Sequence, residues 1–591
     1  MNNSRRNDLD ALRAFAMLLG IGLHAALAYT PSPWAVQDTQ RSESFGLFFV
    51  VVHGFRMPLF FLISGFFTAM LWRQKGLKSL LWHRFQRVLV PCLLGTITVL
   101  PLMAWIASRV APSAPQAAAA IPAASDKPGT SLIDAIRKND PDRVELFSKE
   151  AANLQKPDPQ FFVQPLAWAA MLGHEGLVVM LLDRKADIAA KNGDGSTALH
   201  GAAFTGRPAI VKLLLARGAD PLAKSNDGSV PFQATFADAG TTDFIFGLLQ
   251  LPTRDSAELA DSRKVCRELL PAPTPAPTSL LETIRRQYTG WMTSERWLVQ
   301  LPGMKSPFHL LFTPVFDHLW FLWFLCWLVG LFAVFVQAGA FFERRTTAGS
   351  DMSAFPDASS KNSFALVLLR RLVVSPLRFL WLIPITLLPQ LLMGLFSPSF
   401  GPDTSVGLIP QPHILFYYSI FFGFGILYFE ARDEECRHGR HWWITLPLAL
   451  VILLPLIMSG WMPTVMSGSV LLAASALLQV CYAWLMSAGC MGFFYQFLRT
   501  PRSWIRYMSD SSYWLYIAHM PLLFWIQGST RTAPVSPFIK FFAVCTVATL
   551  LLLLSYETLV RYTWIGAILN GRKYRSGSAR SVRPPAPDGK L

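Results

Sequence analysis

Two ionisable residues, Arg13 and His24, interrupt the apolar segment DALRAFAMLLGIGLHAALA, which runs from Asp10 to Ala28. They are eleven residues apart in the sequence. At about 100° per residue, this spacing returns them to within roughly 20° of the same helical face, about 16 Å apart along the axis. Because ionisable side chains inside a membrane span are costly and usually line a cavity or a pathway, the pair predicts a functional site.

Two other interpretations of this segment are open on its own pattern. Arg5 and Arg6, followed by an apolar run that ends in Ala26-Leu27-Ala28, are also typical of a cleaved signal peptide. Alternatively, Arg13 extends to the lipid headgroups and His24 makes a hydrogen bond within a helix bundle. The later spans favour a functional site, since cleavage would remove one helix of the set and start the next loop on the wrong side of the membrane.

The second apolar segment and the basic stretch after it carry further polar residues. The sequence HGFRMPLFFLISGFF places His53 and Arg56 three residues apart on one helical face, and the small pair Ser64-Gly65 permits close helix approach. Arg84 and Arg87 share another face, and their planar guanidinium groups suit a phosphate. Simple anchoring at the membrane surface by positive charge is an equally open interpretation of these two arginines.

Three later apolar segments also contain polar groups. Asp317-His318-Leu319-Trp320 opens one of them, and His519 lies within another, SYWLYIAHMP. Glu557 and Arg561 near the end of the last segment are four residues apart, so they would neutralise each other. Any one of these groups fits a structural role, but a bundle interior that holds several of them must be wet or filled by a ligand.

The composition excludes an ordinary soluble enzyme. Of 591 residues, 52% are hydrophobic and 15% are charged, which is typical of a polytopic membrane protein. The formal net charge of +16 comes from Lys and Arg that flank apolar runs, so anionic headgroups explain it and no nucleic-acid partner is expected. The seven cysteines are scattered, with no CxxC pair, and predict neither a disulfide framework nor a zinc site.

Ten apolar runs are long enough to span a bilayer. They occur at roughly 11–30, 47–70, 88–108, 318–339, 376–396, 413–429, 442–459, 468–494, 511–527 and 538–558. Alternate short loops are rich in arginine and lysine, and the loops between them carry little beyond Arg41 and Arg531. The positive-inside rule therefore predicts that both termini are cytoplasmic and that the long loop after the third span lies outside the cytoplasm.

That long loop contains a repeat. The 33 residues from Gln164, QPLAWAAMLGHEGLVVMLLDRKADIAAKNGDGS, align with the next 33 from Thr197, TALHGAAFTGRPAIVKLLLARGADPLAKSNDGS. The period and the TALH, LLL…GAD and NxDG elements resemble the ankyrin repeat, which implies three to four helical pairs with a concave face that binds another macromolecule. His174 and His200 occupy repeat positions and have a structural interpretation. Trp291 and Trp297 suit a helix at the membrane interface.

These observations predict an all-α fold, a polytopic bundle of about ten transmembrane helices with an inserted ankyrin solenoid. The predicted divisions are helices one to three at 1–110, an Ala/Pro-rich linker at 111–127, ankyrin repeats at 128–250, a linker with an interfacial segment at 251–305, helices four to ten at 306–571 and a basic cytoplasmic tail at 572–591.

Several motifs in order resemble the acyltransferase-3 family of bacterial inner-membrane acyltransferases. They are Arg-x10-His in the first span, PLFFLISGFF in the second, RFQRVLVP before the third, DHLWFL in the fourth and SYWLYIAHMP near the end. The tail SYETLVRYTWIGAILNGRK and HGFRMPLFF are similar to the glucan-biosynthesis branch, which is associated with succinylation of osmoregulated periplasmic glucans. The resemblance covers about 1–110 and 306–573; the ankyrin insertion departs from the family pattern.

The resemblance implies transfer of an acyl group, succinyl or acetyl, from a cytoplasmic thioester such as acyl-CoA to a hydroxyl of a periplasmic glucan or another cell-envelope carbohydrate. His24 would be the base that deprotonates the acceptor hydroxyl, a task suited to a pKa near 7. Arg13 would hold the donor or its developing negative charge. No cofactor or metal is expected besides the donor.

The remaining site residues receive narrower roles in this scheme. Arg84 and Arg87 would bind the phosphates of the donor. Arg56 or His53 would pair with the free carboxylate of a dicarboxylic acyl group. The pocket for the acyl group and the acceptor would comprise His53, Arg56, Ser64, His318, Trp320, His519 and Glu557. A covalent role for the Ser64 hydroxyl is less favoured than a packing role, because no histidine has a sequence position that pairs with it.

Two functions of other classes remain open. A transporter could move carbohydrate or a precursor through the same polar interior, although paired inverted repeats with broken helices are not evident. A membrane anchor for an ankyrin scaffold explains the repeats but leaves the embedded Arg13, His24 and Glu557 without a role. The expected partners are the acyl donor, a carbohydrate acceptor, membrane lipid and a protein bound by the repeats.

Overall fold

The computed structural model describes residues 6–30, 34–110, 131–158, 161–226, 228–237, 239–252, 254–272, 279–300, 302, 307–346, 364–395, 400–458 and 468–570. The predicted linker at 111–127 and the predicted tail at 572–591 lie outside these residues. The chain divides into two compact units, which we call the membrane unit (Met1–Ala120 with Ser279–Leu591) and the insert unit (Ile121–Thr278).

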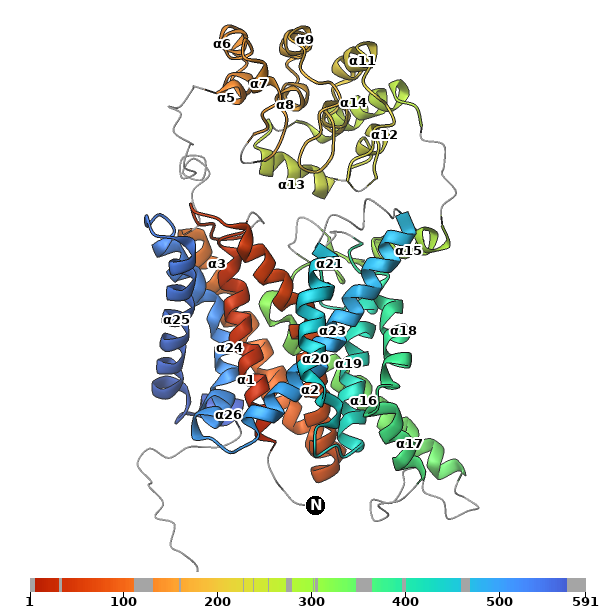
Figure 1. Ribbon diagram of the computed structural model, residues 1–591, viewed down its shortest axis with the longest axis vertical. Helices are drawn as coiled ribbons and strands as arrows, with labels where there is room; N and C mark the ends of the chain where they lie inside the picture. Colours follow the sequence, from red (N-terminus) through yellow and green to blue (C-terminus); the bar gives the residue numbers. More distant parts are fainter. Residues whose placement is uncertain are drawn as a thin grey trace, which may run out of the picture. The chain divides into compact units, whose positions relative to one another are not determined.

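The membrane unit is a bundle of helices whose long members run roughly side by side (Figure 1). Its α-helices are α1 (Asn7–Leu27), α2 (Glu43–Arg84), α3 (Val90–Val110), α15 (Leu280–Met292), α16 (Trp320–Thr346), α17 (Phe364–Val373), α18 (Arg378–Gln390), α19 (Pro412–Glu430), α20 (Trp442–Pro447), α21 (Leu454–Met458), α23 (Gly468–Leu498), α24 (Ser503–Thr530), α25 (Pro537–Ser555) and α26 (Trp564–Asn570).

Short elements complete the membrane unit. Three are π-helices, η1 (Phe85–Leu89), η5 (Leu448–Leu453) and η6 (Tyr556–Val560), and three are 3-10 turns, η2 (Glu295–Trp297), η3 (Asp317–Leu319) and η4 (Arg437–Gly439). The two strands β1 (Leu298–Val299) and β2 (Phe308–His309) pair antiparallel, with Leu298 opposite His309. The fold is therefore all-α apart from this minimal hairpin.

Each of the ten apolar runs predicted from the sequence falls on helix. Six helical stretches in the described residues are long and apolar enough to cross a membrane, or seven if the bent pair of α17 and α18 forms one span. One of the six, Glu43–Val110, joins α2, η1 and α3 and so contains two of the predicted runs. The run at 442–459 is divided among α20, η5 and α21, and α24 contains the run at 511–527. The protein is a multi-pass membrane protein.

Small residues allow the two helices at the centre of the membrane unit, α2 and α19, to approach closely. A Cβ at Gly65 would lie 1.9 Å from the carbonyl oxygen of Phe422, and a Cβ at Gly425 would lie 1.9 Å from that of Leu62. Aromatic rings fill the space around this contact, for example Phe61 against Tyr418 with ring centroids 4.5 Å apart. Ser64-Gly65 thus has the packing role that small pairs usually have in membrane helices.

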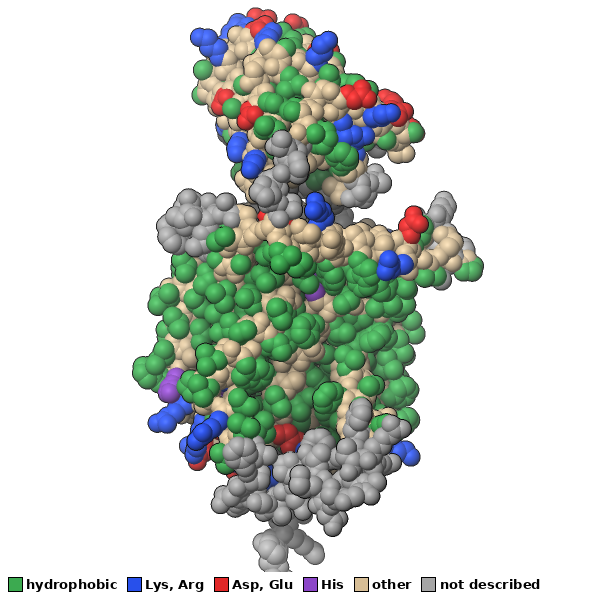
Figure 2. All heavy atoms as spheres, turned by 90° about the vertical axis from the view of Figure 1, so that its right-hand side faces the viewer, with side chains coloured by type: hydrophobic (Ala, Val, Ile, Leu, Met, Phe, Trp, Pro, Cys, Tyr) green, Lys and Arg blue, Asp and Glu red, His purple; other side chains and the backbone are tan. Residues whose placement is uncertain are grey.

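Contacts between distant segments define the two ends of the membrane unit. At one end, which we call the basic end, Arg73 pairs with Glu430 at 2.7 Å and Arg370 Nε donates to the Ala431 carbonyl at 3.0 Å. At the opposite end, Arg531 Nη1 donates to the carbonyl of Val110, the last residue of α3, at 3.4 Å. Hydrophobic side chains cover much of the face between them (Figure 2). This apolar surface is suited to lipid.

The insert unit consists of short helices in pairs. They are α5 (Leu132–Arg137) with α6 (Pro141–Phe147), α8 (Pro165–Leu172) with α9 (Glu175–Asp183), α10 (Ala198–Phe204) with α11 (Pro208–Ala216), and α12 (Pro231–Ala234) with α13 (Ala239–Leu249); α7 (Ala151–Leu154) and α14 (Ser256–Leu269) are additional. Within the repeat from Thr197, the His200 Nδ1 meets the Thr197 hydroxyl at 3.0 Å and its Nε2 meets the Ser229 carbonyl at 3.1 Å. His200 therefore ties the first residue of this repeat to its last, as a structural residue would.

The prediction that residues 251–305 form a linker is wrong over α14. Leu259 and Cys266 of this helix belong to the hydrophobic core of the insert unit, and Arg263 donates from Nε to the Phe204 carbonyl at 2.7 Å. Each repeat buries its apolar face only against a neighbour, so the last one needs a cover, which α14 provides. Cys266 has no exposed surface, and burial raises the pKa of its thiol to about 11.

The helix that follows the insertion, α15, is fastened to the membrane unit. Arg285 Nη1 donates to the carbonyls of Leu391 and Met393, the latter at 3.0 Å, and the Tyr288 hydroxyl meets His413 Nδ1 at 3.1 Å. Trp291 and Trp297, which were predicted for an interfacial helix, pack edge to face with centroids 5.0 Å apart.

Candidate active site

His24 and His519 form the centre of the polar interior. His24, in the last turn of α1, places Nδ1 2.8 Å from Nε2 of His519 in α24, and the two rings stack with centroids 5.1 Å apart. His519 Nδ1 lies 2.7 Å from the backbone carbonyl oxygen of Tyr516. His519 is buried and His24 is partly exposed.

This chain of contacts determines which nitrogens carry hydrogen. A carbonyl oxygen can only accept, so the Nδ1 of His519 must donate to Tyr516. In a neutral His519, Nε2 then carries a lone pair and no hydrogen, so His24 must donate to it from Nδ1. The remaining nitrogen of His24, Nε2, keeps its lone pair. His24 is therefore arranged to accept a proton at Nε2, and His519 holds it in the required tautomer.

Two further groups orient the His24–His519 pair. The Tyr516 hydroxyl donates to the His318 carbonyl at 2.5 Å, and His318 Nε2 lies 3.2 Å from the Ile517 carbonyl, so α24 and the start of α16 are tied together. The indole ring of Trp34 stacks on His24 with centroids 6.1 Å apart. Gln527 accepts from Trp34 Nε1 at 3.3 Å and donates to the carbonyl of Ala25 at 3.2 Å.

Arg56 and His53 of α2 belong to the same group. Both interact electrostatically with His24. Arg56 is 9% exposed, and its guanidinium packs directly against Gly20, where an added Cβ would lie 2.0 Å from Nη1. Its Nε has no hydrogen-bond partner, and no carboxylate in the described chain forms an ion pair with it. His53 stacks on Phe49 and lies under Gly401, whose Cβ would be 2.9 Å from His53 Cδ2.

Arg13 lies on the same face of α1 as His24, as the spacing predicts, because both contact α24. Its Nη2 donates to the Ser509 hydroxyl and, at 3.2 Å, to the Ser509 carbonyl. Asp10 lies 3.5 Å from the same nitrogen and also accepts from the Ser509 hydroxyl at 3.1 Å. Arg13 is thus held by a carboxylate and a serine about three helical turns from His24.

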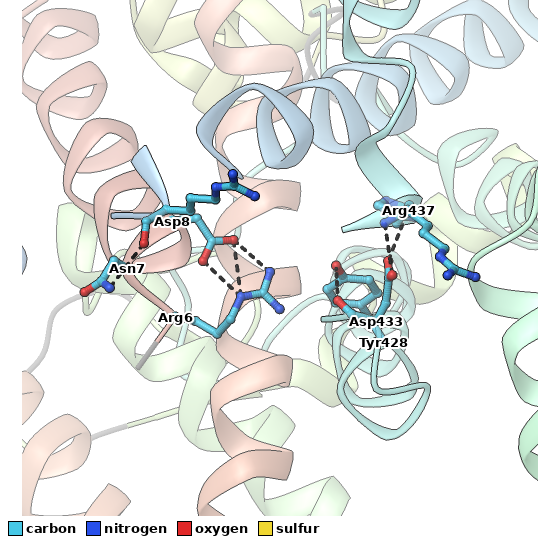
Figure 3. Close-up of polar contacts among 8 residues, drawn as sticks. Arg6, Asn7, Asp8, Tyr428, Asp433 and Arg437 are labelled. Atoms are coloured by element: carbon cyan, nitrogen blue, oxygen red, sulfur yellow. Dashed lines mark hydrogen bonds and ion pairs between the residues drawn. The ribbon is translucent and has the colours of Figure 1, made fainter. Parts of the chain in front are cut away.

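The start of α1 is fixed by neighbouring polar groups at the basic end (Figure 3). The Arg6 side chain points toward the Asp8 carboxylate, with Nη2 at 2.7 Å, and Asn7 donates to the Arg499 carbonyl at 3.3 Å. Beyond them, the Asp433 carboxylate accepts from the backbone nitrogen of Arg437 at 2.9 Å. The Asn7 contact ties the start of α1 to the segment between α23 and α24.

Arg84 directly precedes the π-helical turn η1 and Arg87 lies within it. Elements of this type are frequent at functional sites. Arg84 Nη2 donates to the Thr68 hydroxyl at 2.9 Å, and Thr68 donates to the Ser64 carbonyl at 2.7 Å. Arg84 also interacts electrostatically with Arg13 and Arg87. Ser64 therefore groups with these arginines, about two helical turns from Arg56.

The structure separates Glu557 from the pocket predicted for it. Its carboxylate, in η6, pairs with Arg561 at 2.7 Å and accepts from the Tyr562 hydroxyl at 2.7 Å, both just after η6 and at the opposite end of α25 from Lys540. The four-residue spacing that suggested self-neutralisation explains this. Trp320 is buried against Phe61 and Tyr418, with centroids 6.2 Å and 5.6 Å away, and serves the aromatic core.

Several site residues have no counterpart in the sequence predictions. Ser509 and Gln527 lie ten residues before and eight residues after His519 on α24. At about 100° per residue they share one face with each other, roughly 80° from His519, so their polarity at that mutual spacing was a usable signal. Gly20 lies four residues before His24. Trp34 lies in a loop, where no periodicity identifies it. Over the residues that the structure describes, no group of three His, Cys, Asp or Glu side chains could hold a metal ion.

The fold and the site define a multi-pass helical membrane protein with a hydrogen-bonded pair of histidines inside its bundle. The chain belongs to the acyltransferase-3 family, because that family's model, described as an acyltransferase domain, matches residues 6–122 and 278–557. A second model, ankyrin repeats in three copies, matches residues 132–225.

Curated relatives match a shorter part. The glucans biosynthesis protein C of Shigella dysenteriae serotype 1 is 42% identical over 95 residues, which are 16% of this chain and 24% of the relative. The protein of the same name from Escherichia coli K12 is 41% identical over the same length and with the same coverage. The matched segment thus spans about a quarter of these relatives.

Proposed function

We propose that this protein transfers an acyl group from a thioester on the side of the basic end to a hydroxyl group of a carbohydrate on the opposite side of the membrane. The observation that carries this proposal is the relay from the Tyr516 carbonyl through His519 to His24. It leaves a lone pair on His24 Nε2 in the polar interior of the bundle. A base of this kind is what O-acylation requires.

In the proposed reaction, His24 Nε2 takes the proton of the acceptor hydroxyl as its oxygen attacks the thioester carbonyl carbon. The carbonyl π electrons move to oxygen and form a tetrahedral intermediate. Its collapse re-forms the carbonyl and breaks the carbon–sulfur bond, and the leaving thiolate takes the proton from His24. The products are an ester and a free thiol. His519 accepts a hydrogen bond from His24 throughout and so stabilises the protonated ring.

The donor in this proposal is acyl-CoA, with acetyl or succinyl as the acyl group and no cofactor besides. Arg84 and Arg87 bind its phosphates, since one guanidinium precedes the π-helical turn η1 and the other lies within it. The electrostatic interaction of Arg84 with Arg13 supports a positively charged route along α1. The flexible arm of such a donor would carry the thioester toward His24.

The acceptor in this proposal is a glucan or another carbohydrate of the cell envelope. Support comes from the names of the relatives from Shigella dysenteriae and Escherichia coli. We place the protein in the bacterial inner membrane with cytoplasmic termini, since basic residues gather at the end that holds Arg6 and Arg73. The insert unit would then be periplasmic and bind a protein partner or the acceptor.

Replacement of His24 tests the function. In a strain that lacks the gene, His24→Ala should abolish acylation of periplasmic glycans, measured by mass spectrometry, at unchanged protein level, and should lower kcat of the purified enzyme by about 10²- to 10⁴-fold. His174→Ala in the insert unit is the control and should retain activity. Unchanged acylation with His24→Ala would contradict the proposal and favour a transporter or an anchored scaffold.

A further inference from the structure

Arg56 is a buried cation without a counter-ion. It is 9% exposed, its Nε has no hydrogen-bond partner, and the described residues offer it no carboxylate. The groups that interact electrostatically with it include the hydroxyls of Tyr418 and Tyr516, which are neutral and already donate to backbone carbonyls. An isolated buried charge costs much free energy, and such groups in membrane proteins usually serve function.

The other arginines of the site are better compensated. Arg13 has Asp10 at 3.5 Å and Ser509, and Arg84 has the Thr68 hydroxyl at 2.9 Å. Arg56 thus differs from both in having neither a carboxylate nor a hydrogen-bonded hydroxyl in the described chain. Its missing partner is an anion that the residues in the described part of the chain do not supply.

The position of Arg56 relative to His24 identifies that anion. The Arg56 guanidinium packs against Gly20. Gly20 lies four residues before His24, on the same face of α1. One such step is about 6 Å along the axis. A hydroxyl oxygen within hydrogen-bond reach of His24 Nε2 places the attacked carbonyl carbon one bond further on and its oxygen beyond that. A thioester bound on this face of α1 would therefore bring its carbonyl oxygen toward the guanidinium.

We propose that Arg56 stabilises the oxyanion that forms on the thioester carbonyl during acyl transfer, as the second catalytic group beside His24. This inference rests on the proposed function. As the carbonyl π electrons move to oxygen, the negative charge forms beside a cation that is already in place and largely excluded from water. Fixed donors directed at developing charge in such an environment give large rate effects.

The chain provides its own means of displacing Arg56 without removing it. In Gly20→Ala, the new methyl group would lie 2.0 Å from Nη1, the far end of a flexible side chain, so the guanidinium must move while the backbone need not. Gly22→Ala, two residues along the same helix, would meet Phe48 at 3.4 Å and Phe541 at 3.9 Å, which are ordinary van der Waals contacts. Comparison of Gly20→Ala with Gly22→Ala therefore separates the effect of displacing Arg56 from the general effects of an alanine in α1.

The test compares wild type, Arg56→Gln, Gly20→Ala and Gly22→Ala as purified full-length proteins in nanodiscs. Acetyl-CoA and succinyl-CoA are the donors, and glycan from a strain lacking the gene is the acceptor. We expect Arg56→Gln and Gly20→Ala to lower kcat by about 10²- to 10³-fold with every donor that the wild type uses, with donor KM changed less than about 3-fold. Gly22→Ala should stay within about 2-fold of wild type.

Three results would overturn the inference. Unchanged kcat in Arg56→Gln would show that the cation does not act in the reaction. A higher donor KM at unchanged kcat, or a lower kcat with succinyl-CoA only, would assign Arg56 to the free carboxylate of the acyl group. An equal loss in Gly20→Ala and Gly22→Ala would point to helix packing. If Arg56→Gln does not fold, judged by size-exclusion profile, the glycine pair alone decides. Absence of transfer by the wild type would instead contradict the proposed function.

Discussion

Lys540 and Asp38 form an ion pair of 2.9 Å in which both side chains are 3% exposed. Lys540 Nζ also lies 3.0 Å from the second carboxylate oxygen and donates to the Arg531 carbonyl at 3.3 Å. The backbone nitrogen of Asp38 donates to the Ala28 carbonyl at 2.9 Å. The pair therefore fastens the loop after α1, which carries Trp34 over His24, to the beginning of α25.

Breaking this pair should destabilise the protein. Asp38→Asn leaves the Lys540 ammonium buried without a counter-charge, which typically costs about 3–5 kcal/mol. We expect a lower Tm in detergent, measured by intrinsic fluorescence. Asp38→Leu with Lys540→Met removes both charges and should recover much of the loss. Glu435→Gln removes the partner of Arg437 in an exposed pair and should leave Tm unchanged. Equal Tm values for wild type and Asp38→Asn would contradict this role.

His519 should act through His24 rather than on its own. His519→Ala removes the acceptor that holds His24 in the Nδ1–H tautomer, so we expect kcat to fall by about 10²-fold with little change in donor KM. Because the two residues act as one unit, the double variant His24→Ala/His519→Ala should be no slower than His24→Ala alone. Steady-state kinetics of the three variants measures this. Additive losses would mean that His519 has a separate role.

The contact of α2 with α19 should tolerate no side chain at Gly65. The Cβ of Gly65→Ala would lie 1.9 Å from a backbone oxygen, which cannot move without shifting α19, and such overpacking costs about 1–3 kcal/mol or more. Gly423→Ala on α19 meets nothing within 4 Å and should be neutral or slightly stabilising, since alanine favours helix over glycine. Thermal unfolding of the purified variants compares the two. Similar Tm values would argue against the close contact.

The thiol of Cys266 should be inert in the folded protein. It is completely buried, and its pKa of about 11 leaves almost no thiolate near neutral pH. We expect no labelling by a membrane-impermeant maleimide until the protein is denatured. Ser256 begins the same helix and is exposed, so Ser256→Cys should label promptly. Rapid labelling of Cys266 in the native protein would contradict the packing of α14.

The same variant reports the side of the membrane on which the insert unit lies. With Cys266→Ser as background, Ser256→Cys should react in intact spheroplasts if the insertion is periplasmic. Reaction only after permeabilisation would place it in the cytoplasm and contradict the orientation that the positive-inside rule predicts.

Local periodicity predicted those parts of the site that lie within one helix. The spacing of Arg13 and His24 predicted a shared face, and both residues contact α24, through Ser509 and His519. The partners themselves could not be predicted from spacing, because His24 and His519 are 495 residues apart in the sequence and only helix packing brings them together. The close approach of Arg56 to Gly20 depends on the same packing.

The insertion shows where composition misleads. Its Pro-rich flank and many charges predicted a linker from residue 251, yet Leu259, Cys266 and Leu270 recur at helical spacing and are buried. The spacing of these apolar residues predicts a helix there, although the segment is polar overall, because a helix needs only a narrow apolar stripe to cover one repeat. Glu557 shows the opposite error, in which polarity was taken as a sign of a site. An acidic residue in an apolar run can instead be neutralised by an arginine one helical turn away, as Arg561 neutralises Glu557.

The long sequence separation of His24 and His519 also has a consequence for biosynthesis. At translation rates of about 5–20 residues per second, roughly 25–100 s pass between the synthesis of the two histidines. During that interval the nascent chain lacks the group that orients its base. Under the proposed function, a chain that has not yet inserted α24 would transfer the acyl group at least about 10²-fold more slowly than the complete protein, as predicted for His519→Ala. Full activity would then arise only when one of the last helices is inserted.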